Sequence, residues 1–230
     1  MKKSWTRNSL YILKHATDLS HYNRWIVSLF YGHFGKDILE VGSGLGGLSQ
    51  YLPKTGITLS DIQDDFFSYL KHRFDYKTIK LDIEKDSPIK LHHSYDTIFC
   101  SNVFEHIQDD GKAMKNCFQT LKKNGKFLLF VPARPEIYGN LDKAMGHYRR
   151  YTKDDLSQNA KEAGFKIIKI KYVNFLGYFT WWLRGRFSST SNTDSLTAKI
   201  FDTLVVPILY LEKYIPIPFG QSLILIAQKK

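Results

Sequence analysis

The stretch Glu40-Val41-Gly42-Ser43-Gly44-Leu45-Gly46-Gly47 decides the fold of this chain. It follows an apolar run over residues 37–41 (DILEV) that is typical of a buried strand. Glycines at a strand end let the backbone turn tightly and approach a ligand that a Cβ atom would push away. The pattern predicts a strand, a glycine loop and then a helix over residues 46–52, which ends before Pro53.

Three interpretations of the glycine loop are open at this point. Gly42, Gly44 and Gly47 satisfy the dinucleotide pattern GxGxxG, and Asp61 lies where an acid that binds a ribose belongs. Glu40 argues against a pyrophosphate, which it would repel, and suits a cationic ligand or an ordered loop. A tight turn that binds no ligand is the third interpretation.

Strand-like and helix-like runs alternate along the rest of the chain. Further strands are predicted at residues 57–59, 78–81, 95–100, 127–131, 165–173 and 222–227. Helices are predicted at residues 66–74 and 111–122, the second of which ends at Asn124-Gly125, and Thr152 can cap a later one. This alternation predicts a doubly wound parallel α/β sheet.

We predict one domain over residues 1–230, with a helical segment at residues 1–35. The last two predicted strands are separated by residues 174–221, which is far longer than an ordinary connection. Seven aromatic residues occur between Tyr172 and Phe187. We therefore expect a helical, aromatic-rich insertion that either contacts a membrane surface or caps the fold or a dimer interface.

The charge and cysteine content narrow the class of protein. Lys and Arg number 33 against 22 Asp and Glu, so the net charge of +11 favours polyanionic partners such as nucleic acid, anionic lipid or phosphorylated substrates. Cys100 and Cys117 match neither a disulfide framework nor a zinc motif, and no metal site is predicted. We expect a cytoplasmic protein that has no export signal and does not cross a membrane.

The segment ILEVGSGLG at residues 38–46 resembles the first motif of class I S-adenosylmethionine-dependent methyltransferases. The resemblance covers residues 36–132 and continues through TLSDI, IKLDI, the run from Tyr95 to Asn102, FEHI and LKKNGKFLLFVP. It implies a Rossmann-like sheet of seven strands, mostly parallel with the last strand antiparallel. It also implies S-adenosylmethionine as the cofactor.

Ten cofactor-binding residues follow from this resemblance. Asp61 would accept hydrogen bonds from the ribose hydroxyls, Asp82 would meet the adenine amino group, and the glycine backbone would face the methionine part. Either acid could instead cap a neighbouring helix or turn. The full set is Glu40, Gly42, Ser43, Gly44, Asp61, Ile62, Asp82, Ile83, Ser101 and Asn102.

Two further segments resemble a subset of these methyltransferases that is associated with cell-envelope polysaccharide and lipid-linked sugar pathways. They are HYNRWI at residues 21–26 and GHYRRYT at residues 146–152. We expect His147 or His106 to be the catalytic base, although His106 could only pack beside a strand and His147 could be a turn residue. The expected substrate-binding residues, of which the arginines could also be surface cations, are Tyr22, Arg24, Tyr148, Arg149 and Arg150.

These observations predict a methyltransferase that uses S-adenosylmethionine and acts on a small-molecule or lipid-linked, anionic acceptor. A sugar hydroxyl is one candidate acceptor, and the inner face of the membrane is the expected location. The alternatives are an RNA methyltransferase, an NAD-dependent oxidoreductase and a non-catalytic, membrane-associated module. Nucleic acid is the less favoured partner because the basic residues are spread along the chain.

Overall fold

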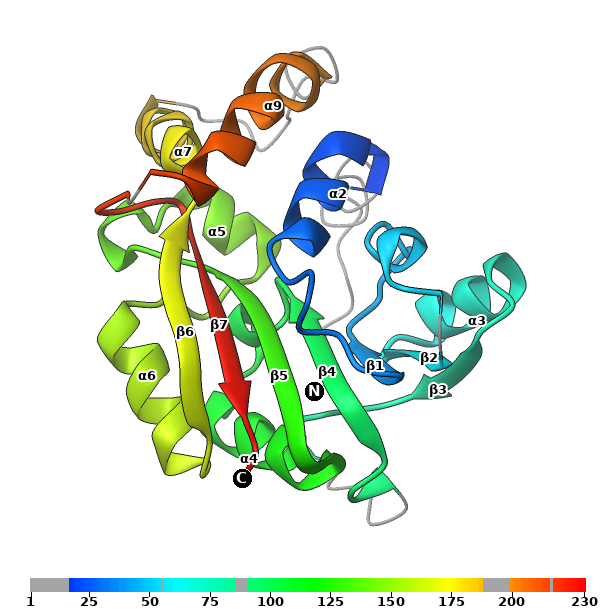
Figure 1. Cartoon of the computed structure of the whole chain (residues 1–230). Coiled ribbons are helices and arrows are strands. Elements are labelled where there is room, and N and C mark those ends of the chain that lie inside the picture. The colour runs from blue at the N-terminus through cyan, green and yellow to red at the C-terminus, as the bar shows by residue number, and fades with distance from the viewer. Residues whose placement is uncertain (1–16, 55, 86–90, 188–198, 216) are drawn as a thin grey trace.

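A computed structural model describes residues 17–54, 56–85, 91–187, 199–215 and 217–230 (Figure 1). Seven strands form the sheet: β1 (Asp37–Val41), β2 (Gly56–Asp61), β3 (Lys77–Lys80), β4 (Tyr95–Ser101), β5 (Leu121–Pro132), β6 (Lys166–Val173) and β7 (Ser222–Gln228). Their order across the sheet is β3-β2-β1-β4-β5-β7-β6. Strand β7 runs antiparallel to β5 and β6, whereas the other neighbours are parallel. The predicted fold class is therefore confirmed.

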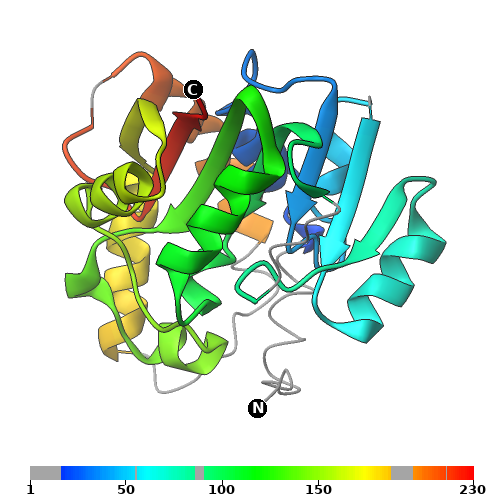
Figure 2. The ribbon, with the colours of Figure 1, turned by 90° about the horizontal axis from the view of Figure 1, so that it is seen from below.

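Helices cover both faces of the sheet, so the central strands carry apolar residues on both sides. On one face, Met114 of α4 (Asp110–Thr120) and Leu156 of α6 (Lys153–Glu162) pack with Leu129 of β5, and Figure 2 shows the two helices on the same face. On the other face, Trp25 of α2 (Ser20–Ser28) and Leu70 of α3 (Asp64–Arg73) pack with Leu128.

The insertion before β7 contains helical elements in its described residues. These are α7 (Phe175–Phe187), the π-helix η5 (Phe201–Val205), α9 (Val206–Leu209) and the 3-10 helix η6 (Tyr210–Lys213). Figure 1 shows that α7 and α9 lie with α2 and α5 (Asn140–Met145) beyond the carboxyl ends of the parallel strands. Ligands of open α/β sheets bind at this edge. Among the described residues, no helix is long and apolar enough to span a membrane.

The prediction of a helix over residues 46–52, directly after the glycine loop, is wrong about the length of that helix. Only the 3-10 helix η1 (Ser49–Tyr51) forms there. Gly46 has φ +73°, and the ring of Phe74 lies 2.2 Å from where its Cβ atom would be. The loop therefore continues past Gly46, because Phe74, which directly follows α3, packs against the backbone of Gly46.

The predicted end of the second helix is also wrong. Helix α4 ends at Thr120, and β5 begins at the next residue. Asn124 has φ +65°, but its backbone N–H donates to the carbonyl oxygen of Lys229 at 2.8 Å. Asn124-Gly125 therefore belong to the beginning of β5, where they pair with the chain beyond β7.

Candidate active site

The glycine loop joins β1 to β2 through left-handed glycines. Gly42, Gly44 and Gly46 have φ values of +72°, +55° and +73°. The backbone N–H groups of Gly42 and Ser43 both donate to the carbonyl oxygen of Ser60 at 2.9 Å. A cavity of about 280 Å³ lies beside the loop, lined by Thr17, Asp18, Leu45 and Tyr69. The loop is thus held by β2 and borders open space.

Glu40 belongs to the interior of this loop. Its residue is 2% exposed, and its carboxyl group accepts a hydrogen bond from the hydroxyl of Ser49. Burial raises the pKa of Glu40 to about 7, although the hydrogen bond from Ser49 opposes that shift. Of the two roles that suited Glu40 in the sequence, the structure favours that of ordering the loop.

Asp61 connects the loop to the end of β2. Its two oxygens accept hydrogen bonds from the backbone N–H groups of Gly44 and Gln63, both at 2.9 Å. Burial raises the pKa of Asp61, although these hydrogen bonds act to lower it. Because each carboxylate oxygen has a second lone pair, both can still accept from a ribose hydroxyl. The donors that this carboxylate needs for its orientation are thus already in place.

The other expected cofactor residues lie at neighbouring strand ends. The carboxylate of Asp82 accepts from the backbone N–H of Glu84 at 3.2 Å, which is the turn-capping arrangement. Ile62 is 42% exposed, whereas Ile83 is 4% exposed. At the end of β4, Asn102 has φ +52° and donates through its side chain to Ser101 Oγ at 3.4 Å.

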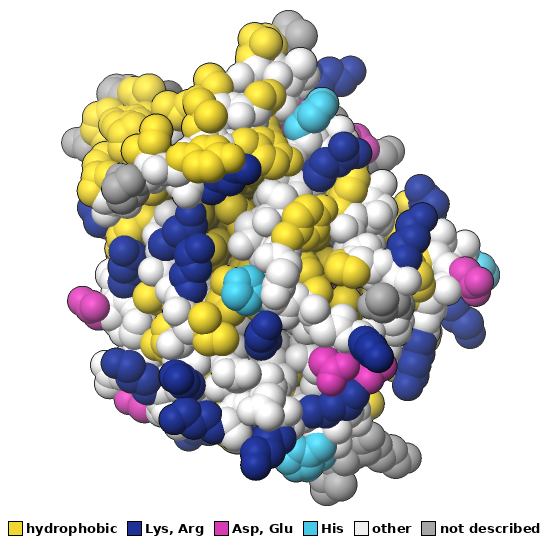
Figure 3. All heavy atoms as spheres, viewed as in Figure 1, with side chains coloured by type: hydrophobic (Ala, Val, Ile, Leu, Met, Phe, Trp, Pro, Cys, Tyr) yellow, Lys and Arg dark blue, Asp and Glu magenta, His cyan; other side chains and the backbone are white. Residues whose placement is uncertain are grey.

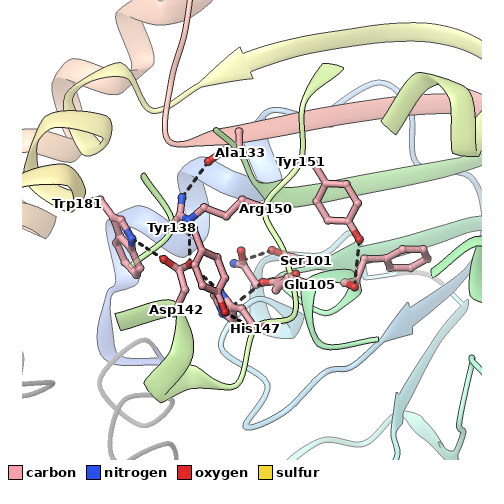
Figure 4. Close-up of polar contacts among 11 residues, drawn as sticks. Ser101, Glu105, Ala133, Tyr138, Asp142, His147, Arg150, Tyr151 and Trp181 are labelled. Atoms are coloured by element: carbon pink, nitrogen blue, oxygen red, sulfur yellow. Dashed lines mark hydrogen bonds and ion pairs between the residues drawn. The ribbon is translucent and has the colours of Figure 1, made fainter. Parts of the chain in front are cut away.

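Glu105 and His106, which follow β4, lie beside His147 of the loop after α5, and Figure 4 shows Glu105 and His147 of this histidine cluster. His147 is 7% exposed, and its ring lies edge-on against the ring of His106 with centroids 4.7 Å apart. His147 Nε2 is 3.9 Å from Glu105 Oε1. Burial raises the pKa of Glu105 to about 7, although the charge of His147 opposes that shift. The backbone N–H of Tyr148 donates to the carbonyl oxygen of Glu105 at 2.7 Å and connects the two segments.

Asp142 holds this cluster from the other side. Its buried carboxylate lies 2.9 Å from His147 Nδ1 and accepts from Arg150 Nε at 2.8 Å and Trp181 Nε1 at 3.2 Å. Figure 4 shows these three side chains converging on it. Burial acts to raise the pKa of Asp142, but the hydrogen bond to His147 and the charge of Arg150 leave it below its ordinary value.

Arg150, which was expected to bind substrate, is buried and only 5% exposed. It donates to Asp142 and to the carbonyl oxygen of Ala133 at 2.9 Å, and it stacks over the ring of Trp181 at 4.8 Å. Those contacts engage its guanidinium in the interior of the protein. Arg149 is paired with Asp110 at 2.6 Å, whereas Tyr148 is 44% exposed beside the histidines.

Two of the expected substrate-binding residues, Tyr22 and Arg24, belong to α2. Tyr22 stacks on Trp25 with centroids 5.4 Å apart, and burial raises the pKa of its hydroxyl. Arg24 is exposed, with its guanidinium 5.4 Å from the ring centre of Tyr51. Asp202 of the insertion accepts from the backbone N–H of Tyr22 at 2.8 Å. Helix α2 is thereby anchored between the glycine-loop region and the insertion.

Glu105 and Asp142 are the two residues of this site that sequence reasoning missed. Both occur within quoted or neighbouring segments, but neither was predicted to act. The sequence offered one clue to them: Glu105 follows a predicted strand end and Asp142 lies shortly before GHYRRYT, so both acids could have been expected near that segment at the carboxyl edge of the sheet. The pairing becomes visible in the folded chain, where contacts such as the hydrogen bond between the backbones of residues 105 and 148 join the two segments.

The fold, the glycine loop and the acids at the strand ends together define a methyltransferase site. A family model described as "Methyltransferase domain" matches residues 18–170, and the chain belongs to this family. It is an S-adenosylmethionine-dependent methyltransferase, and S-adenosylmethionine is its cofactor.

Proteins with similar sequences have names more specific than that of the family. The chain is 26% identical over 159 residues to a ubiquinone biosynthesis O-methyltransferase of Coxiella burnetii, covering 61% of this chain and 68% of the relative. It is 28% identical over 155 residues to the enzyme of that name from Nitrosospira multiformis, covering 59% and 65%. The resemblance to the cell-envelope subset is not confirmed by these relatives.

Solved structures agree on the fold. A SAM-dependent methyltransferase from Thermotoga maritima superposes with a TM-score of 0.65 at 16% identity, covering 93% of this chain and 91% of the other. A SAM-dependent methyltransferase from Archaeoglobus fulgidus gives a TM-score of 0.62 at 15% identity, with 93% and 94% covered. At these identities the likeness concerns the fold alone.

Proposed function

We propose that this methyltransferase transfers the methyl group to a hydroxyl oxygen of a small or lipid-linked acceptor that it meets at a membrane surface. The observation that carries this proposal is the histidine cluster at the sheet edge, directly beside an insertion with exposed apolar side chains. The names of the curated relatives, which are O-methyltransferases, support an oxygen acceptor.

S-adenosylmethionine supplies a methyl group that its sulfonium has already activated. The residues at the glycine loop and the strand ends hold and orient that group, and the histidine cluster activates the acceptor. Asp142 orients the ring of His147, so that Nε2 is directed toward Glu105 and His106. The acceptor O–H bond then breaks, its proton passes to this cluster, and the oxygen takes the methyl group as the bond to sulfur breaks.

We expect His147→Ala to lower methyl transfer by about 10²-fold or more, which is typical for the loss of a group that acts on a proton in the transition state. The dissociation constant of S-adenosylmethionine should stay unchanged, because His147 contacts neither the glycine loop nor Asp61. Release of S-adenosylhomocysteine and calorimetric titration measure the two quantities. His72→Ala, on the exposed side of α3, is the matched control. Unchanged turnover in His147→Ala would remove this residue from the mechanism.

The insertion presents most of the exposed apolar surface of the described chain. Nine of its fourteen exposed large hydrophobic side chains lie there: Phe179, Trp182, Leu183, Ile200, Leu204, Ile208, Leu211, Tyr214 and Ile215. Figure 3 shows hydrophobic side chains gathered over α7 and α9, with basic side chains beside them. Apolar side chains next to cations suit a surface of anionic lipid, and the net charge of +11 adds attraction.

The double substitution Leu204→Glu with Ile208→Glu should therefore weaken binding to phosphatidylglycerol vesicles by at least tenfold. These side chains are 64% and 51% exposed, and an acid there loses apolar contact and repels anionic lipid. Ile168→Glu on β6, which is 44% exposed, is the control and should bind as the wild type does. Vesicle flotation measures the effect. Wild-type protein that stays unbound, or that forms a dimer broken by the double substitution, would contradict the membrane proposal.

A further inference from the structure

We propose that Glu105, His106 and His147 bind a divalent transition-metal ion. Each offers one ligand atom, and the three atoms lie within 4.8 Å of one another. Around an ion with bonds of about 2.0–2.2 Å, ligand atoms lie roughly 3–4 Å apart, so small side-chain movements complete the site. The pattern was invisible in the sequence, because Glu105-His106 and His147 belong to no metal motif and meet only in the fold.

The two buried ligands have polar atoms that lack hydrogen-bond partners. Neither carboxylate oxygen of Glu105 is hydrogen-bonded, nor is His147 Nε2. Their side chains are 1% and 4% exposed, and the 3.9 Å between Glu105 Oε1 and His147 Nε2 is too long for a hydrogen bond. Leaving such groups unpaired in the interior costs several kcal/mol. A cation placed between these atoms satisfies all of them.

The surroundings of His147 are those of a metal ligand. Its Nδ1 lies 2.9 Å from the carboxylate of Asp142, so the N–H is assigned to Nδ1 and the lone pair to Nε2. Metal-bound histidines commonly donate their second ring N–H to a carboxylate in this way. Asp142 is in turn held by Arg150 and by the backbone N–H of Gly139 at 3.0 Å. The ring is therefore oriented before any ion binds.

The donor set selects the kind of ion and its role. Two imidazoles and one carboxylate suit Zn²⁺, Mn²⁺ or Fe²⁺ better than Ca²⁺ or Mg²⁺, and three protein ligands leave a position open. The site opens on the side of His106, which is half-buried, whereas the other two ligands are buried. With the ion bound, the ligand lone pairs of the cluster are occupied, so the ion would replace the cluster as the group that activates the acceptor, and a hydroxyl in the open position would lose its proton to water. This role rests on the proposed function, whereas binding of the ion does not.

The test is calorimetric titration of the EDTA-treated full chain with Zn²⁺, Mn²⁺ and Mg²⁺, without acceptor. We expect one Zn²⁺ or Mn²⁺ per chain and at least 100-fold weaker binding by Glu105→Gln and by His106→Ala. His106 is half-buried, so His106→Ala still tests the site if the substitution of the buried Glu105 unfolds the protein. His72→Ala should bind like the wild type. The proposal is overturned if the wild-type protein binds no stoichiometric ion, or if both ligand variants bind the ion as tightly as the wild type does.

Co²⁺ gives a second readout, because d–d absorption of a three-ligand site should appear in the wild type and disappear in Glu105→Gln. The outcome also separates the two proposals. Methyl transfer to a hydroxyl acceptor by a chain that binds no stoichiometric ion would overturn the metal site and leave the proposed function standing. An ion bound through these residues, in an enzyme that methylates only nitrogen, would keep the site and overturn the proposed function.

Discussion

Gly42→Ala is expected to lower the affinity for S-adenosylmethionine by at least tenfold and the free energy of unfolding by about 2–4 kcal/mol. Gly42 has φ +72°, a conformation that costs an L-residue roughly 1–2 kcal/mol. An added Cβ atom would also lie 2.3 Å from Cγ2 of Val103 and 3.2 Å from Cγ1. The loop and the end of β4 must then move apart, and both border the expected position of the cofactor.

Gly32→Ala is the matched control for this prediction. Gly32 has φ +83°, but nothing lies within 4 Å of its added Cβ atom. The substitution should lower the free energy of unfolding only by the cost of a left-handed backbone at an L-residue, roughly 1–2 kcal/mol, and leave cofactor affinity unchanged. Gly42→Ala combined with Val103→Ala should recover part of the affinity. Urea unfolding and calorimetry measure these effects, and wild-type affinity in Gly42→Ala would contradict the predicted role of the loop.

Asp142→Ala is expected to lower the free energy of unfolding by about 3–5 kcal/mol. The substitution leaves the guanidinium of Arg150 buried without its carboxylate, which is the costly way to break a buried pair. Trp181 Nε1 and the backbone N–H of Gly139 lose their acceptor as well. Since Trp181 belongs to α7, we also expect the insertion to become more open to proteolysis.

Asp64→Ala provides the comparison, because Asp64 pairs with Lys80 on the surface. The two side chains are 67% and 45% exposed. Exposed pairs add little to stability, so no measurable change is expected in the same urea titration. A loss below about 1 kcal/mol in Asp142→Ala would show that Arg150 reaches water and that the network has no structural role.

Local patterns predicted the sheet and its cofactor edge well. Strands such as residues 95–100 and 222–227 were recognisable because an unbroken apolar run is required wherever helices cover both faces. The glycine loop was recognisable for a comparable reason, since left-handed backbone at a strand end requires glycine. Errors occurred where distant segments intervene, as with Phe74 against Gly46 and Asn124 paired to Lys229.

The sequence by itself determined the fold class and the glycine loop, because those depend on patterns within a few residues of each other, and the resemblance over residues 36–132 implied the cofactor. Tertiary structure decided which charged groups are buried and whom they pair with. Arg150, expected to bind substrate, is buried and paired with Asp142, and Glu105 is buried in the candidate site. Glu105 and His147 meet because the two segments pack together, with a hydrogen bond between the backbones of residues 105 and 148. Burial and pairing arise when segments some forty residues apart pack together, and no local pattern records that contact.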